Sequence, residues 1–156
     1  MSRARTDGRN AAAMPAALLE FIERFNRGEY WESHEVLEAP WRIHRSDFYQ
    51  GLILLASAYV HAQRGNAAGI AKQMAKAHRR LAPYRPHYLG IDVDELLCIA
   101  ERAMQLAAHT TPGTSQAVPS VRLTIRPELV RGDEEELSWA GTPPADEPPR
   151  QGRNQK

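Results

Sequence analysis

The sequence has little of several features that would point to a particular class of protein. Cys98 is its only cysteine, so the chain can form neither an internal disulfide nor a cysteine-based zinc site. Its formal net charge is +1, whereas domains dedicated to nucleic acid are usually strongly basic. The sequence also contains no phosphate-binding loop, dinucleotide fingerprint or serine-nucleophile motif. A nucleic-acid partner is therefore not expected.

Long apolar runs are missing as well. The longest such run, around residues 52–60, is too short to span a bilayer. Arginines near the N-terminus are followed by alanines that Pro15 interrupts, which differs from the apolar core of a secretory signal. We therefore expect no membrane association and a cytoplasmic location.

What is present is the composition and periodicity of an ordinary helical domain. The 156 residues are 42% hydrophobic, enough for one compact domain with a real core. We predict an all-α fold, a single compact bundle of about five helices over residues 14–109. A disordered arm, residues 1–13, would precede it, and an irregular or disordered tail, residues 110–156, would follow it.

Five segments show apolar residues at helical spacing, and turn or capping residues separate them. Asp47, Asn66 and Asp92 are the expected N-caps of the last three helices, and Glu95 completes a capping box with Asp92. Residues 83–91 are expected to form a loop. The expected helical ranges are about 15–26, 29–44, 47–60, 66–83 and 92–109.

The tail changes character several times. Apolar and polar residues alternate over 121–126, which predicts a short extended segment that either packs on the bundle or stays loose. The acidic run 133–136 and the proline-rich residues 143–149 are predicted to be disordered. Trp139 stands alone in this polar tail and is a candidate docking residue, for a partner or for the domain itself.

Polar residues on the second expected helix indicate a functional or structural site. At 100° per residue, His34 and Glu38 project between Trp31 and Trp41, on what we take to be the inner face. Burying an imidazole and a carboxylate is costly unless both are satisfied. Pro40 removes one helical hydrogen bond and predicts that this helix bends or ends nearby.

The third expected helix offers a partner for this face. His61, Gln50 and Ser57 form one polar stripe on an otherwise apolar helix. In an antiparallel pair of helices, His61 would lie near the N-terminal half of the second helix, at the level of His34. Two interior polar stripes on neighbouring helices are most easily satisfied by facing each other.

One hypothesis is a divalent metal ion, zinc, manganese, iron or nickel, held by His34, Glu38 and His61. Glu35 would be a fourth ligand or the catalytic base of a metal-dependent hydrolase, because a bound water can be activated at an open coordination position. A bound small ligand would suit the same polar site. The residues expected to line the pocket are Trp31, Trp41, Gln50 and Ser57.

The alternative is a non-catalytic helical interaction or scaffold module, which would bind other proteins or further copies of itself. In that case His34 bonds Glu38, Glu38 also pairs with Arg42 one turn later, and the network fixes helix packing. A site needs Glu38 and His61 directed at one open cavity. A scaffold needs them bonded to neighbours, so the two hypotheses differ in an observable way.

Three motifs together resemble a known family. They are Asn26-x-Gly28-x-x-Trp31-x-x-His34-Glu35-x-x-Glu38-x-x-Trp41, Phe48-x-Gln50-Gly51-Leu52 and Leu89-Gly90-Ile91-Asp92. The chain resembles, over roughly residues 16–100, the bacterial and archaeal domain of unknown function 309 family. His34, Glu38 and Trp41 match its hallmark, H-x-x-x-E-x-x-W. The resemblance implies an all-helical fold and a suspected metal-binding role for the motif, and it supplies no substrate.

Overall fold

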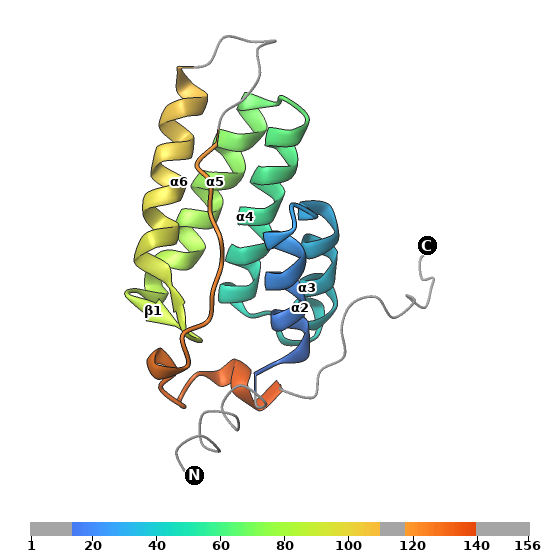
Figure 1. The fold of residues 1–156 in the computed structure, drawn as a ribbon, viewed down its shortest axis with the longest axis vertical. Helices are drawn as coiled ribbons and strands as arrows, with labels where there is room; N and C mark the ends of the chain where they lie inside the picture. Colours follow the sequence, from blue (N-terminus) through green and yellow to red (C-terminus); the bar gives the residue numbers. More distant parts are fainter. Residues whose placement is uncertain (1–13, 110–117, 140–156) are drawn as a thin grey trace.

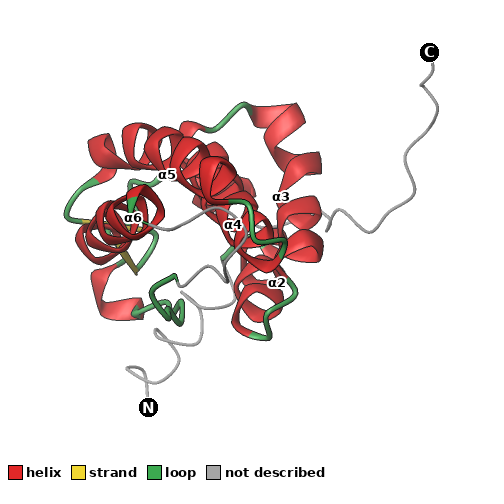
Figure 2. Cartoon of the chain, turned by 90° about the horizontal axis from the view of Figure 1, so that it is seen from above, coloured by secondary structure: helices red, strands yellow, loops and turns green. Residues whose placement is uncertain are grey.

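The computed structural model describes residues 14–109 and 118–139, and these form a helical bundle (Figure 1). Seen from above, α4 lies in the middle, with α5 and α6 on one side and α2 and α3 on the other (Figure 2). The predicted all-α bundle of about five helices is confirmed. Its helices are α2 (Ala16–Asn26), α3 (Tyr30–His44), α4 (Asp47–Gln63), α5 (Ala67–Leu81) and α6 (Val93–Ala108).

The expectations for residues 1–13, 110–117 and 140–156 lie outside the described residues. The division into a bundle domain and a tail stays a prediction. Among the described helices, none combines the length and the apolar character that crossing a membrane requires.

Local capping chemistry starts α5 and α6 where the sequence predicts. The Asn66 side chain accepts a hydrogen bond from the Gly69 amide at 3.0 Å, and Asp92 accepts one from the Glu95 amide at 3.0 Å. Each bond satisfies a backbone donor that has no partner inside its helix. Both predicted N-caps are therefore confirmed.

The start of α4 differs by one residue from the prediction. Ser46, not Asp47, is the N-cap, and its hydroxyl accepts from the Tyr49 amide at 3.1 Å. Asp47 is the first helical residue, where a carboxylate is favoured by the helix dipole. Arg45 just before the cap has a φ of 59°, which turns the chain sharply between α3 and α4.

Pro40 does not end α3, which continues to His44. The ring lies on the buried face of the helix, so packing offsets part of the cost of the lost hydrogen bond, which is about 3 kcal/mol in a regular helix. Of the two alternatives at this proline, a bend or an end, the end does not occur, and α3 reaches the predicted His44.

The predicted loop 83–91 contains more order than expected. A single 3-10 turn, η1 (Ala82–Tyr84), follows α5, and then β1 (His87–Tyr88) pairs antiparallel with β2 (Ile91–Asp92). Leu89 and Gly90 at the turn have φ values of 51° and 76°, as a tight two-residue hairpin requires. These strands are too short to show the alternation by which strands are recognised in a sequence.

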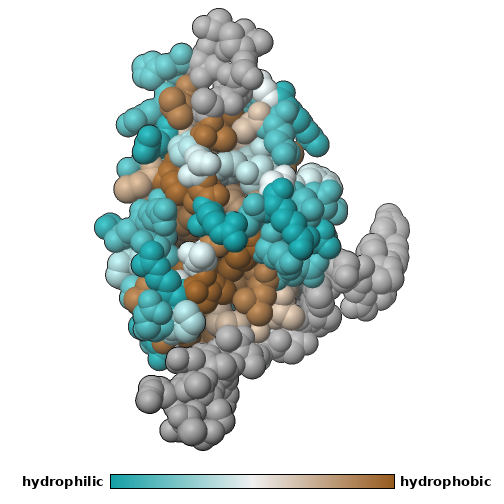
Figure 3. All heavy atoms as spheres, viewed as in Figure 1, coloured by the Kyte–Doolittle hydropathy of each residue, from teal (hydrophilic) through white to brown (hydrophobic). Residues whose placement is uncertain are grey.

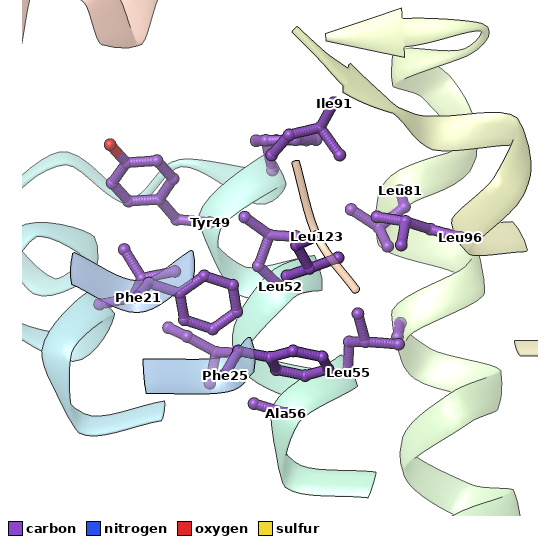
Figure 4. Packing of buried hydrophobic residues seen from close by; sticks show 14 of the residues in the cluster. Phe21, Phe25, Tyr49, Leu52, Leu55, Ala56, Leu81, Ile91, Leu96 and Leu123 are labelled. Carbon is purple, nitrogen blue, oxygen red and sulfur yellow. The ribbon is translucent and has the colours of Figure 1, made fainter. Parts of the chain in front are cut away.

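The hydrophobic core is built around α4. Figure 4 shows Phe21 and Phe25 of α2 packed against Leu52 and Leu55 of α4, and all four are fully or almost fully buried. Leu123, from far along the chain, also lies in this cluster and is 3% exposed. A fully buried leucine side chain contributes about 1.5–3 kcal/mol through the hydrophobic effect.

Residues 118–126, here called the strap, run down the length of the bundle (Figure 1). The same view in Figure 3 shows apolar side chains gathered along the middle of this face, with hydrophilic ones on both sides. The Tyr59 hydroxyl donates to the Pro119 carbonyl, and the Arg126 amide donates to the Gly90 carbonyl at 2.9 Å. Of the two alternatives for this segment, the structure shows the packed one.

The acidic run is ordered, so the prediction of disorder over 133–136 is wrong. After a short turn, η2 (Pro127–Leu129), the chain crosses the end of the bundle and forms η3 (Glu135–Trp139). Glu134 and Glu136 are each only 3% exposed. A charge run usually marks a solvated segment. Here Glu136 accepts hydrogen bonds from the bundle, and Glu134 accepts them from the Leu89 amide and from the Gly132 amide of its own segment.

Candidate functional site

The predicted site residues of α3 lie at the edge of its buried face. The His34 side chain is 17% exposed and that of Glu38 is 34% exposed. The sequence projection predicts that both lie on the inner face, yet it is the preceding residue, Ser33, that is fully buried. The residues that α3 buries are Ser33, Val36, Leu37 and Pro40. The helix is therefore rotated, relative to the prediction, so that Glu38 faces outward.

His34, Glu38 and Arg42 form a chain of polar contacts along one side of α3. The distance from His34 Nε2 to Glu38 Oε2 is 3.5 Å, and Arg42 Nη2 donates to Glu38 Oε1 at 3.1 Å. This is the pattern predicted for the structural network. The other ring nitrogen of His34, Nδ1, is buried and has no hydrogen-bond partner within the described part of the chain.

The two tryptophans of the motif have different environments. The Trp31 side chain is 47% exposed and lies parallel to the His34 ring, with 5.3 Å between the ring centroids. Trp41 is half-buried, and the Arg45 guanidinium lies 4.4 Å above its ring. Trp31 is therefore a surface aromatic supported by His34 and not a residue of the core.

His61 lies at the expected end of the bundle but points elsewhere. Gln63 donates to the Gly28 carbonyl at 3.2 Å, so the end of α4 does lie beside the start of α3. The His61 ring is directed at α5 instead: its Nδ1 is 3.1 Å from Asn66 Nδ2. A Cβ added to Gly69 would come within 2.4 Å of the same nitrogen.

The structure does not bring the three predicted ligands together. Across residues 14–109 and 118–139, no three histidine, cysteine, aspartate or glutamate side chains are placed to hold one metal ion. Glu35 is exposed on α3, and Gln50 and Ser57 are half-buried on α4. Among the described residues, the donor set from the helix projection, His34, Glu38 and His61, therefore does not form a three-ligand ion site.

A second polar cluster, which sequence reasoning missed, lies where α3 ends and α4 begins. The Glu136 carboxylate accepts hydrogen bonds from the hydroxyls of Ser46, at 2.7 Å, and of Tyr88. Burial, followed by this hydrogen bond, raises the pKa of Tyr88 above its usual range. Trp139 stacks on His44 with 3.8 Å between ring centroids.

Tyr49 is part of the same cluster. Its side chain is fully buried, and its hydroxyl has no hydrogen-bond partner among the described residues. In Figure 4 this hydroxyl points away from Leu52 and Phe25. Burial, and then the charge of Glu136, raise the pKa of Tyr49. The only sequence signal for this cluster was Trp139, the isolated aromatic of the tail.

Comparison with known proteins identifies the family but not an activity. The family model described as "Domain of unknown function (DUF309)" matches residues 18–73, from α2 into α5, and so includes the His34 and Glu38 motif. Uncharacterized protein YpuF of Bacillus subtilis (strain 168) is 31% identical over 121 residues, which cover 73% of this chain and 67% of that protein. No solved structure gives a significant match. The chain therefore belongs to the DUF309 family.

Proposed function

We propose that the protein is a non-catalytic helical interaction module in which the His34, Glu38 and Arg42 network is structural. One observation carries the proposal: the Glu38 carboxylate is shared by two neighbours on its own helix, while His61 contacts Asn66 instead. Of the two sequence hypotheses, the scaffold is the one that needs these groups bonded to neighbours. A cytoplasmic location remains part of this proposal.

The network would hold one aromatic side chain in place for binding. The Trp31 ring lies parallel to the His34 ring, and the Glu38 carboxylate lies 3.5 Å from the Nε2 of His34. Each i,i+4 pair stabilises a helix by about 0.2–0.5 kcal/mol. A large side chain that is held in one orientation loses less entropy when it binds.

The binding surface would be the outer side of α3, here called the α3 stripe and defined as Trp31, Glu38 and Arg42. These residues are spaced by seven and four positions, so they lie in one row along the helix. Tryptophan and arginine are the residues most enriched among binding hot spots between proteins. A half-exposed indole beside an arginine therefore favours a protein surface as the partner.

A second candidate is a divalent cation bound by His34 and Glu38 alone. The 3.5 Å between imidazole and carboxylate favours it, because one turn of helix lets both groups approach one ion. Such an ion would have to displace Arg42 from Glu38 and obtain its remaining ligands from water or from a partner. A hydrolytic role with Glu35 as the base belongs to this candidate.

Affinity capture from source cells tests the interaction proposal, with Trp31→Ala compared against Glu32→Ala. Glu32 is the exposed neighbour of Trp31 and lies outside the α3 stripe, so it is a matched control. We expect a protein that the wild type and Glu32→Ala both enrich and that Trp31→Ala loses. A set of captured proteins that Trp31→Ala leaves unchanged would remove the α3 stripe as the contact surface.

A further inference from the structure

One end of the bundle carries a small binding site that is occupied by the chain's own η3 segment. We define the seat as His44, Ser46, Tyr49 and Tyr88, contributed by the end of α3, the start of α4 and β1. The occupant is η3, which crosses this end of the bundle in Figure 1. The seat contains none of the α3 stripe residues, so this inference is independent of the proposed function.

The occupant is held by one carboxylate and one indole. Two hydroxyls of the seat, those of Ser46 and Tyr88, donate to the Glu136 carboxylate. Three residues later, Trp139 stacks on His44 and meets the Tyr49 ring edge-on, with 5.6 Å between the centroids. The Glu-x-x-Trp spacing therefore matches two different subsites, one for an anion and one for an aromatic ring.

The seat also has a donor that this occupant does not use. The Tyr49 hydroxyl is fully buried beside Trp139 and lacks a hydrogen-bond partner in the part of the chain that the structure describes. An unsatisfied buried hydroxyl costs about 1–3 kcal/mol. A ligand that placed an additional acceptor here would recover that cost, so η3 is an incomplete occupant.

The occupant is also expected to leave more easily than the helices unfold. Leu137 and Trp139 are only half-buried, whereas docking removes the Glu134 and Glu136 carboxylates almost completely from water. Burying a carboxylate is unfavourable even when it is hydrogen-bonded. The strap is anchored separately, by the hydrogen bonds between Asn26 and Leu123. η3 can therefore detach from the bundle while the strap stays in place.

We propose that the seat is a docking site for an acidic–aromatic segment of a partner protein, and that Glu136 and Trp139 close it from within the same chain. The ligand class follows from the chemistry: the hydroxyl donors of Ser46 and Tyr88 favour a carboxylate, and the rings of His44 and Tyr49 favour an indole. The tethered occupant competes at an effective concentration in the millimolar range. Binding of a partner therefore requires that the tail be displaced.

The test uses the full chain carrying Glu136→Ala and Trp139→Ala, here called the emptied chain. The probe is a fluorescent synthetic peptide with the sequence of residues 132–139, and its anisotropy reports binding. We expect the emptied chain to bind it at least about tenfold more tightly than the wild type, because no tethered competitor remains. Tyr88→Phe in the emptied chain should weaken binding. Tyr84→Phe, on the ring tilted at 59° against that of Tyr88, should not.

Equal affinity of the wild type and the emptied chain would overturn the proposal, as would no binding to an emptied chain with wild-type circular dichroism. Hydrogen exchange of the wild type gives a second test that needs no variant. Amides of η3 should exchange by local opening, well before those of α4. Exchange of both segments at one common rate would show that the seat opens only on global unfolding and would contradict the proposal.

Discussion

Asn26 and Leu123, 97 residues apart, form a reciprocal pair of hydrogen bonds. Asn26 Nδ2 donates to the Leu123 carbonyl at 2.8 Å, and the Leu123 amide donates to Asn26 Oδ1 at 2.8 Å. The carboxamide thus does for the strap what a neighbouring strand does in a sheet. Both backbone groups of Leu123 are satisfied while its side chain enters the core. Asn26 opens the first of the three motifs, and this pair gives it a structural role.

Asn26→Ala should destabilise the protein by about 2 kcal/mol, because both backbone groups of Leu123 lose their partner. Urea unfolding measures the loss. Gln63→Ala is the control, since it removes one exposed side-chain bond to a backbone carbonyl and should cost little. If Asn26→Ala costs no more than this control, the reciprocal pair does not hold the strap.

Gly51→Ala should destabilise the bundle although alanine is the better helix former by about 1 kcal/mol. A Cβ at this position would lie 2.6 Å from two carbons of Leu81, where α4 and α5 approach each other closely. The double variant with Leu81→Ala should lose less stability than the two single changes summed. Thermal unfolding of the four proteins measures this coupling, and strict additivity would refute the close contact.

Tyr49→Phe should stabilise the protein by about 1 kcal/mol, whereas Tyr88→Phe should destabilise it by a similar amount. The first change removes a buried hydroxyl that has no partner in the described residues, and the second removes a donor to Glu136. Chemical denaturation of both variants gives the comparison. A loss of stability on Tyr49→Phe would show that this hydroxyl is bonded in solution.

His34→Ala should lower the melting temperature in metal-free buffer, with a loss of about 1 kcal/mol. The imidazole contacts both Trp31 and Glu38, so its removal frees the indole and leaves Glu38 with Arg42 alone. Glu35→Ala, an exposed neighbour, is the matched control. An unchanged melting temperature would count against a structural role for the network.

Features set by neighbouring residues could be predicted from the sequence. The caps at Asn66 and Asp92 depend on side chains that reach a backbone amide three residues away. The bonds within α3 depend on i,i+4 spacing, so the His34, Glu38 and Arg42 contacts were also predictable. Such interactions need no knowledge of how the helices pack.

The rotation of α3 could not be predicted from the sequence, because the projection assumes that the aromatic residues of a helix lie on its buried face. Trp31, which the projection predicts on the inner face, is 47% exposed, while Ser33 is fully buried. Ser33 tolerates burial since its hydroxyl donates to the Tyr30 carbonyl at 2.8 Å within the same helix. The prediction that the His61 ring faces α3 is wrong for a related reason. The short turn that includes Asn66 places α5 against this ring.

The docking of the tail depends on contacts between residues distant in sequence. Glu136 finds its donors on Ser46 and Tyr88, 90 and 48 residues away. Nothing in the acidic run itself distinguishes a buried carboxylate from a solvated one. The isolated Trp139 was the one local sign, and it does dock on the domain.

If the hallmark motif is structural, as we propose, His34 and Glu38 hold no metal ion. The most direct test is elemental analysis by plasma mass spectrometry of the purified, untagged chain and of His34→Ala. Both would first be incubated with zinc, manganese, iron and nickel. We predict no stoichiometric metal in either protein. Near-stoichiometric metal in the wild type that is lost in His34→Ala would contradict the account and establish the cation site.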